Sequence, residues 1–181
     1  MTDVTIRVET DDDRKAVRDV VAEAFVHEPV VADLVDRLRD SSGWRPGMAL
    51  VAEHERAIVG YVLATRAWLD APDALVDVLL LSPLAVRPDH QGRGIGGALV
   101  RALLDLARAR DEPGIFLEGS PAYYSRFGFS AAGDSGIRRP STRIPAPAFQ
   151  VVWLPSYDEN RHTGTLAYPD AFWELDCVGL R

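Results

Sequence analysis

The 181-residue sequence has little of what typically stabilises a secreted or membrane-bound protein. It contains one cysteine, Cys177, so the chain can form no intramolecular disulfide and no thiolate metal site of its own. No apolar run reaches the roughly 18 residues of a transmembrane helix, because the longest nearly apolar stretch, 76–86, contains Asp77, Ser82 and Pro83. The first residues lack the basic and apolar regions of a secretory signal. We therefore expect a soluble cytoplasmic protein, with no membrane partner.

Basic residues are outnumbered, since 20 Lys and Arg stand against 27 Asp and Glu, a net charge of −7. This balance disfavours nucleic-acid binding, which needs a basic surface to neutralise phosphates. The segment 86–110 reverses the charge, because five arginines there face only Asp89 and Asp105. These arginines are Arg87, Arg93, Arg101, Arg108 and Arg110. The asymmetry favours an anionic ligand near this segment.

The four histidines show no metal-ligand spacing, so we expect no metal site. They are His27, His54, His90 and His162, for which we expect surface or loop positions, with His90 facing solvent. Apolar residues make up 47% and charged residues 26% of the chain, as in an average globular protein. At this length we expect a single domain over residues 1–181.

Apolar periodicity divides the chain into strands and helices. In chain order it predicts a strand at 4–8, two helices within 11–39, strands at 49–52, 57–65 and 76–86, a helix that follows a glycine-rich loop at 87–97, a strand at 115–117 and a short helix at 121–127. The stretch 76–86 is apolar on both faces, which indicates a central strand. From 129 to 181 five prolines separate short apolar runs, so we expect two or three edge strands and long loops.

The glycine-rich loop carries the most specific chemistry in the sequence. Glycines at 92, 94, 96 and 97 follow a buried strand and open a helix. Glycine lets the backbone approach a ligand closely, and the free N–H groups at a helix start bind phosphate oxygens. Arg87 and Arg93 add positive charge at the same end. This arrangement predicts a pyrophosphate-containing ligand.

One such ligand is a nicotinamide dinucleotide, because Gly92-x-Gly94-x-x-Gly97 matches the dinucleotide fingerprint and Glu118 follows about 20 residues later. Residues 87–91, however, separate the glycines from their strand. An apparent antiparallel meander precedes the motif, where repeated βαβ units would be expected. An NAD(P)-dependent oxidoreductase is therefore the weaker alternative.

A second pattern agrees better with the chain as a whole. Gln91-Gly-Arg-Gly94-Ile-Gly96 resembles the acetyl-CoA signature of the GNAT N-acetyltransferase superfamily, Gln/Arg-x-x-Gly-x-Gly/Ala. The segment 122–129, with Tyr124 shortly before Gly128-Phe129, is similar to a late helix of the same superfamily. The resemblance covers about residues 4–130, and 131–181 would add C-terminal strands and loops. The runs 34–39 and 145–149 resemble one bacterial branch of predicted N-acetyltransferases.

The resemblance implies a single-domain α/β fold, whose mixed, mostly antiparallel sheet has helices on both faces and is splayed at the acetyl-CoA site. It implies acetyl transfer from acetyl-CoA, without a metal, to a primary amine by direct attack in a ternary complex. Backbone groups of Leu84, Ala85 and Val86 would bind the pantetheine arm. The pyrophosphate would lie against Gln91, Gly92, Arg93, Gly94, Ile95, Gly96 and Gly97. Tyr124 would protonate the departing thiolate, while Tyr123 packs.

One family feature is missing, and it leaves the general base unassigned. Many members of the superfamily place a glutamate on the central strand, where this chain has Leu80, Leu81 and Ser82. Asp77 and Glu118 remain as candidates, as does a water-relayed base. The acceptor, a small-molecule or peptide amine, is equally open, and a homodimer through the late strands is compatible with the sequence. A domain that binds acetyl-CoA without turnover is the main alternative function.

Three further residues receive packing roles. Trp44 and Trp68 are expected in loops beside the acceptor cleft, and Cys177 is expected to be a small buried residue.

Overall fold

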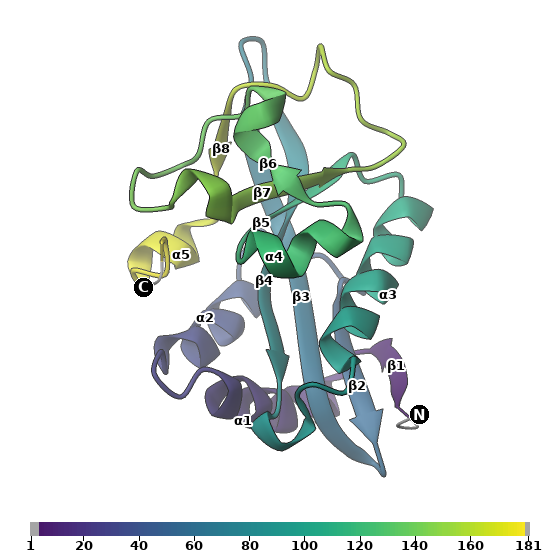
Figure 1. The fold of residues 1–181 in the computed structure, drawn as a ribbon. Helices are drawn as coiled ribbons and strands as arrows, with labels where there is room; N and C mark the ends of the chain where they lie inside the picture. The colour runs from purple at the N-terminus through teal and green to yellow at the C-terminus, as the bar shows by residue number, and fades with distance from the viewer. Residues whose placement is uncertain (1–3, 180–181) are drawn as a thin grey trace.

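A computed structural model describes residues 4–179, and Figure 1 shows a sheet with helices on both of its faces. The strands are β1 (Thr5–Val8), β2 (Ala49–His54), β3 (Ala57–Asp70), β4 (Leu75–Val86), β5 (Gly114–Glu118), β6 (Ser130–Ala131), β7 (Phe149–Trp153) and β8 (Thr165–Ala167). The α-helices are α1 (Arg14–Ala24), α2 (Val30–Arg39), α3 (Ile95–Ala109), α4 (Pro121–Tyr124) and α5 (Asp170–Glu174). Short 3₁₀ turns are η1 (Asp11–Asp13), η2 (Pro88–His90), η3 (Ser125–Phe127), η4 (Ala132–Ser135) and η5 (Ala146–Ala148).

Within residues 4–179 the strands form one eight-stranded sheet in the order β1-β2-β3-β4-β5-β7-β6, and β8 pairs with the far end of β3. Neighbouring strands are antiparallel except for β4 and β5, which are parallel. The predicted mixed, mostly antiparallel sheet is confirmed. The long strands β3 and β4 lie at its centre (Figure 1), as the apolar stretch 76–86 indicates.

Each face of the sheet has its own apolar core. Helices α1, α2 and α5 cover one face, where alternate β3 residues such as Tyr61 and Leu63 are fully buried. Helix α3 and the α4–η3 turn cover the other face, through α3 leucines such as Leu99 and Leu103. A helix with apolar residues on one side and a strand with apolar residues on both produce this layered packing.

The sheet opens between β4 and β5. These strands pair only at Leu79–Ile115 and Leu80–Phe116, and β5 then continues along β7. The register between β3 and β4 also shifts near Val62, so that Ser82 and Pro83 form a bulge. Beyond Leu80, the edge of β4 that faces away from β3 pairs with no strand among the described residues. The predicted splay is therefore present.

Two expectations from the sequence are wrong in detail, and one short helix was missed. Strand β3 extends to Asp70, so Trp68 lies in a strand, paired with Asp77 and Ala167, and not in a loop. Strand β7 is an internal strand between β5 and β6, not an edge strand. The short helix α5 was not predicted at all. The extra cross-strand partners of β3 and β7 lie far away in sequence, where local periodicity carries no information.

Among the described residues no helix is both long and apolar enough to cross a membrane. His162 lies in a loop, as expected, but is buried, since its ring lies 6.2 and 5.7 Å from the rings of Trp153 and Tyr157. Its Nδ1 accepts a hydrogen bond from the Asp158 amide at 2.9 Å. Trp44 lies in a loop and packs against the core beneath α1 and α2.

Candidate functional site

Two cavities lie along the splayed end of β4, and both are lined by Leu84. The first, of about 540 Å³, is formed by the glycine-rich loop, the start of α3 and the α4–η3 turn. The second, of about 390 Å³, lies between β4, the end of β5, the α1–α2 turn and the C-terminal segment. We refer to them as the loop cavity and the inner cavity. Together they form one candidate site on both sides of Leu84.

The loop cavity has the backbone geometry of an anion site. Gly94 caps α3 with φ of 84°, and Gly92 also has a positive φ of 73°. A side chain at either position would meet no protein atom within 4 Å, so both glycines border open space. The first-turn N–H groups of the 15-residue helix α3 have no partners within the helix. This helix end favours an anion through its dipole and its free donors.

Most of the predicted ligand-binding residues line the loop cavity. They are Leu84, Val86, Gln91, Gly92, Gly94, Ile95, Gly96 and Gly97. Gln91 also donates from Nε2 to the Val86 carbonyl at 2.9 Å, which holds the loop against β4. Ala85 and Arg93 do not line the cavity. Ala85 is buried in the opposite core, and Arg93 donates to the Asp89 carbonyl at 2.8 Å.

The positive charge of the loop cavity comes from Arg101, which belongs to the basic segment 86–110, and from Arg126, which the sequence analysis missed. Arg101 and Arg126 line it, whereas Arg87 instead contacts Glu23 and Asp89 at 3.4 and 3.3 Å. The Arg126 guanidinium lies 4.1 Å from the centre of the Tyr123 ring, which also lines the cavity. Arg101 is four residues after Gly97 on α3, so helical periodicity could have placed it beside the glycines.

His90 also borders the loop cavity and is less exposed than expected. Its side chain is 16% exposed, and its ring lies edge-on to His54 with centroids 5.7 Å apart. The expectation of a solvent-facing histidine is therefore wrong, because the β2–β3 hairpin packs against this loop.

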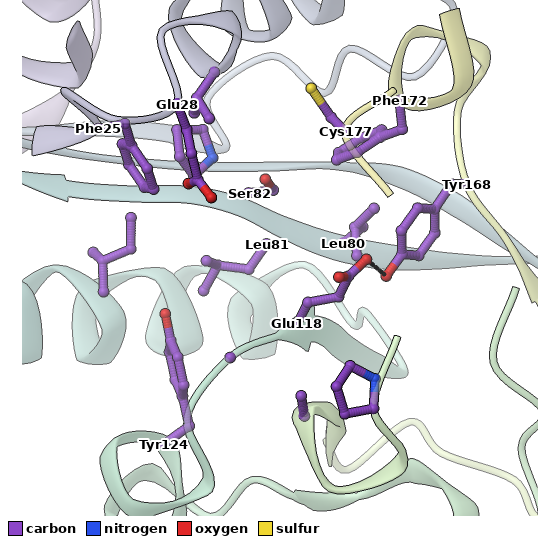
Figure 2. A pocket seen from close by; sticks show the side chains of 16 residues that line it. Phe25, Glu28, Leu80, Leu81, Ser82, Glu118, Tyr124, Tyr168, Phe172 and Cys177 are labelled. Carbon is purple, nitrogen blue, oxygen red and sulfur yellow. Dashed lines mark hydrogen bonds between the residues drawn. The ribbon is translucent and has the colours of Figure 1, made fainter. Parts of the chain in front are cut away.

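Tyr124 lines the inner cavity, and Figure 2 shows its hydroxyl pointing into it. Burial, with a smaller contribution from Tyr123, raises the pKa of this phenol well above its usual value. The ring contacts those of Tyr123 and Phe129, at centroid distances of 4.9 and 5.6 Å. A side chain at Gly119 would collide with the Tyr124 ring, so glycine at this position allows the observed placement.

Glu118 lies at the end of β5 and lines the same cavity. Its carboxylate accepts hydrogen bonds from the Tyr168 hydroxyl at 2.8 Å and from the Gly179 amide at 3.0 Å. Burial raises the pKa of Glu118, and the two hydrogen bonds oppose this shift in part. Of the two carboxylates considered from the sequence, only Glu118 lines the cavity, and Asp77 is paired with Arg45 at 2.6 Å elsewhere on β4.

The remaining wall of the inner cavity combines apolar and acidic groups. Leu80, Leu81 and Ser82, at the positions where the family resemblance implies a glutamate, line the cavity. Glu28, from the turn between α1 and α2, lines it as well and was missed, since a single glutamate in a turn has no motif. Cys177 is buried, as expected, and burial raises the pKa of its thiol to about 11. Trp44 and Trp68 line neither cavity.

This arrangement joins an anion site to a cavity that holds a phenol and a carboxylate. A dinucleotide fold would instead need repeated parallel βαβ units, and β4–β5 is the only parallel pair of named strands among residues 4–179. Within the same residues, no three His, Cys, Asp or Glu side chains are grouped so that they could hold a metal ion.

Comparison with known proteins agrees with these features. Residues 15–129 match the family model described as "Acetyltransferase (GNAT) family". The chain is 35% identical to the uncharacterized N-acetyltransferase YjhQ of Escherichia coli K12 over 137 residues, 75% of each chain. It is 30% identical to the uncharacterized N-acetyltransferase YhbS of the same strain over 169 residues, 92% of this chain and 97% of YhbS.

Solved structures show the same fold. The crystal structure of Escherichia coli YhbS in complex with CoA matches with a TM-score of 0.84 and 28% identity, over 93% of this chain and 91% of that one. A GNAT acetyltransferase from Brucella melitensis in complex with acetyl-CoA matches with a TM-score of 0.76 and 28% identity, over 95% and 99%. The chain therefore belongs to the GNAT family of acetyltransferases and is an acyltransferase that uses acetyl-CoA.

Proposed function

We propose that the chain transfers the acetyl group of acetyl-CoA to a primary amine by direct attack in a ternary complex. The observation that carries this proposal is the position of Leu84, which lines both cavities on the unpaired edge of β4. A pantetheine arm that follows this edge from the loop cavity would bring its thioester into the inner cavity. The amine would be a small molecule or the amine of a peptide.

The coenzyme would be held mainly by backbone groups. The pyrophosphate would accept hydrogen bonds from the N–H groups of the segment 91–97, and Arg101 and Arg126 would balance its charge. Leu84 and Val86 would offer to the pantetheine amides the backbone groups that point away from β3, as an added strand would, and Gln91 already donates to the Val86 carbonyl. Ala85 would contribute only by holding these two residues in place, because its side chain lies in the opposite core and its backbone groups face Tyr61 of β3. Arg93 would act through its backbone alone, since its side chain is held by Asp89.

In the reaction, the nitrogen lone pair of the neutral amine attacks the thioester carbonyl carbon. The carbon–sulfur bond then breaks, and CoA leaves as a thiolate that accepts a hydrogen bond from the Tyr124 hydroxyl and takes its proton from solvent. Backbone N–H groups near Leu84 polarise the carbonyl during the attack. Burial keeps Tyr124 protonated at neutral pH, while a thiol has a pKa of only about 8.5. Proton transfer to a free thiolate would run uphill, so Tyr124 would act by donating a hydrogen bond as negative charge develops on sulfur.

We further propose Glu118 as the group that accepts the proton of the amine, directly or through one water. Its position in the inner cavity and its raised pKa both suit a general base. The hydrogen bonds from Tyr168 and Gly179 fix the carboxylate and leave each oxygen a further lone pair. This assignment replaces the strand glutamate for which the chain has Leu80, Leu81 and Ser82.

Two measurements test the proposed function. Calorimetric titration should show binding of acetyl-CoA and none of NAD, because the loop cavity borders a splayed antiparallel sheet and not a dinucleotide fold. Release of free CoA thiol should then depend on an added amine, with the acetylated amine identified by mass spectrometry. Binding of acetyl-CoA without thiol release across a broad amine panel would contradict transfer and favour a sensor domain.

A further inference from the structure

The charges in the inner cavity are all of one sign. Glu28 and Glu118 line it, and no lysine or arginine does so within residues 4–179. Arg143 lowers the pKa of Glu118, but it is ion-paired with Asp176 and lies outside the lining. A substrate that enters this cavity therefore meets two carboxylates and no cation.

Glu28 differs from the acidic residues around it. Asp33 and Asp36, on the neighbouring helix α2, are both ion-paired with Arg18. The Glu28 carboxylate has no ion-pair or hydrogen-bond partner among the described residues, although the residue is partly buried. Figure 2 shows this carboxylate pointing into the cavity, on the side opposite Glu118 and Tyr124. An unpaired, partly desolvated carboxylate is unfavourable until a cation joins it.

The walls between the two carboxylates suit an aliphatic chain with cationic ends. Leu80, Leu81 and Val31 provide apolar surface, and Phe25, Tyr168 and Phe172 contribute ring faces. Such rings attract ammonium groups, while leucine side chains pack against methylenes. The cavity volume of about 390 Å³ is enough to hold a short aliphatic amine.

We infer that the acceptor is a short aliphatic diamine that carries no carboxylate. One nitrogen reacts beside Tyr124 and Glu118, while the other stays protonated and pairs with Glu28. This inference rests on the proposed function and narrows its amine acceptor. Amino acids are disfavoured, because their carboxylate would enter a cavity that already holds two negative charges. Each of the two carboxylates, Glu118 and Glu28, thus contacts one nitrogen of the diamine.

Three amines of matched length test the inference with acetyl-CoA as donor. 1,5-Diaminopentane is the diamine, n-pentylamine lacks its second charge, and lysine is the same diamine with an added carboxylate. We expect kcat/KM for the diamine to exceed that for pentylamine by about tenfold, as for one hydrogen-bonded ion pair, with lysine the poorest acceptor. Equal values for the diamine and pentylamine, or a lysine value at least as high as the diamine value, would overturn the inference.

The variant Glu28→Gln tests whether Glu28 causes the preference for the diamine over n-pentylamine. It should lower kcat/KM for the diamine about tenfold and change the pentylamine value much less. Glu159→Gln removes the same charge from an exposed loop and should leave the diamine preference intact. A diamine preference that survives Glu28→Gln, with acetyl-CoA affinity and melting temperature as in the wild type, would overturn the role of Glu28.

The inference and the proposed function fail in different ways. Acetylation of other amines, with none of 1,5-diaminopentane, would overturn the diamine inference and leave acetyl transfer established. Binding of acetyl-CoA without acetylation of any amine would overturn both.

Discussion

At the scale of single residues, burial determines the acid–base behaviour of Tyr124 and Glu118. It raises the pKa of both groups, with opposite consequences for their use. The phenol is held in its neutral form, as a hydrogen-bond donor needs. The carboxyl group becomes a stronger base than an exposed glutamate.

Replacing Tyr124 with phenylalanine removes the hydroxyl and keeps the ring contacts with Tyr123 and Phe129. We expect kcat to fall by about 10²-fold, as for the loss of one hydrogen-bond donor to a developing negative charge. Acetyl-CoA affinity and melting temperature should change little. Tyr157→Phe removes a hydroxyl from a ring stacked on Trp153, away from both cavities, and should leave kcat unchanged. A normal kcat in Tyr124→Phe would show that the Tyr124 hydroxyl does not stabilise the departing thiolate.

The pH dependence of kcat tests Glu118. A carboxylate accepts a proton only when ionised, so activity should be lost as pH falls through the pKa of Glu118, at a pH above the usual value of about 4.3. Tyr168→Phe removes a hydrogen bond that lowers this pKa, so the midpoint should move to higher pH. Glu118→Gln should abolish the acidic limb. If the limb stays in place in both variants, it belongs to another group.

At the scale of elements, a substitution at the junction of the glycine-rich loop with α3 tests whether this junction binds the coenzyme, and a second glycine elsewhere provides the control. Gly94 and Gly136 both have positive φ, and a side chain at either would meet no protein atom within 4 Å. Valine therefore imposes similar backbone strain of roughly 1–2 kcal/mol at both positions. Because only Gly94 lines the loop cavity, Gly94→Val should weaken acetyl-CoA binding by at least about tenfold. Gly136→Val should not.

Calorimetric titration of the two folded variants measures the difference in their affinity for acetyl-CoA. The same affinity in both would show that the backbone at Gly94 does not approach the coenzyme.

Local sequence patterns predict the elements of this fold well where the chain contacts its near neighbours. The predicted helices within 11–39 and the central strand at 76–86 agree closely with α1, α2 and β4. The end of β3 was placed too early, because Trp68 is held in the sheet by Ala167 of β8, about a hundred residues away. The internal position of β7 has the same kind of cause, since its partners β5 and β6 lie far from it in sequence.

The functional site likewise contains residues that the sequence predicts and residues that it does not. Backbone-binding positions such as Gly94 follow from glycine spacing, because glycine is needed wherever the chain turns against a ligand. Side chains that contribute charge are harder to predict. Arg126 and Glu28 reach the cavities from a short turn and from an interhelical turn, and neither belongs to a spaced pattern. Arg87 and Arg93 are close to the loop in sequence, but Glu23 and the loop itself hold their side chains.

At the scale of the whole molecule, the net charge of −7 conceals an arrangement of opposite signs around one site. The loop cavity contains Arg101 and Arg126, and the inner cavity contains Glu28 and Glu118. An anionic coenzyme and a cationic amine would therefore each be attracted to its own side of Leu84. The acidic remainder of the surface opposes coenzyme binding at long range, so the local arginines must dominate the interaction.

This balance predicts how salt affects coenzyme binding. The affinity for acetyl-CoA should fall as ionic strength rises, because salt screens the attraction between the arginines and the phosphates. Arg126→Gln should weaken binding about tenfold at low salt and reduce the salt dependence, since one charge-assisted contact is lost. Arg108→Gln removes a charge that α3 pairs with Asp105 outside the cavity, so it should behave like the wild type. Calorimetric titrations of both variants with acetyl-CoA at several salt concentrations measure these effects. Equal effects of the two substitutions on affinity would show that Arg126 makes no phosphate contact.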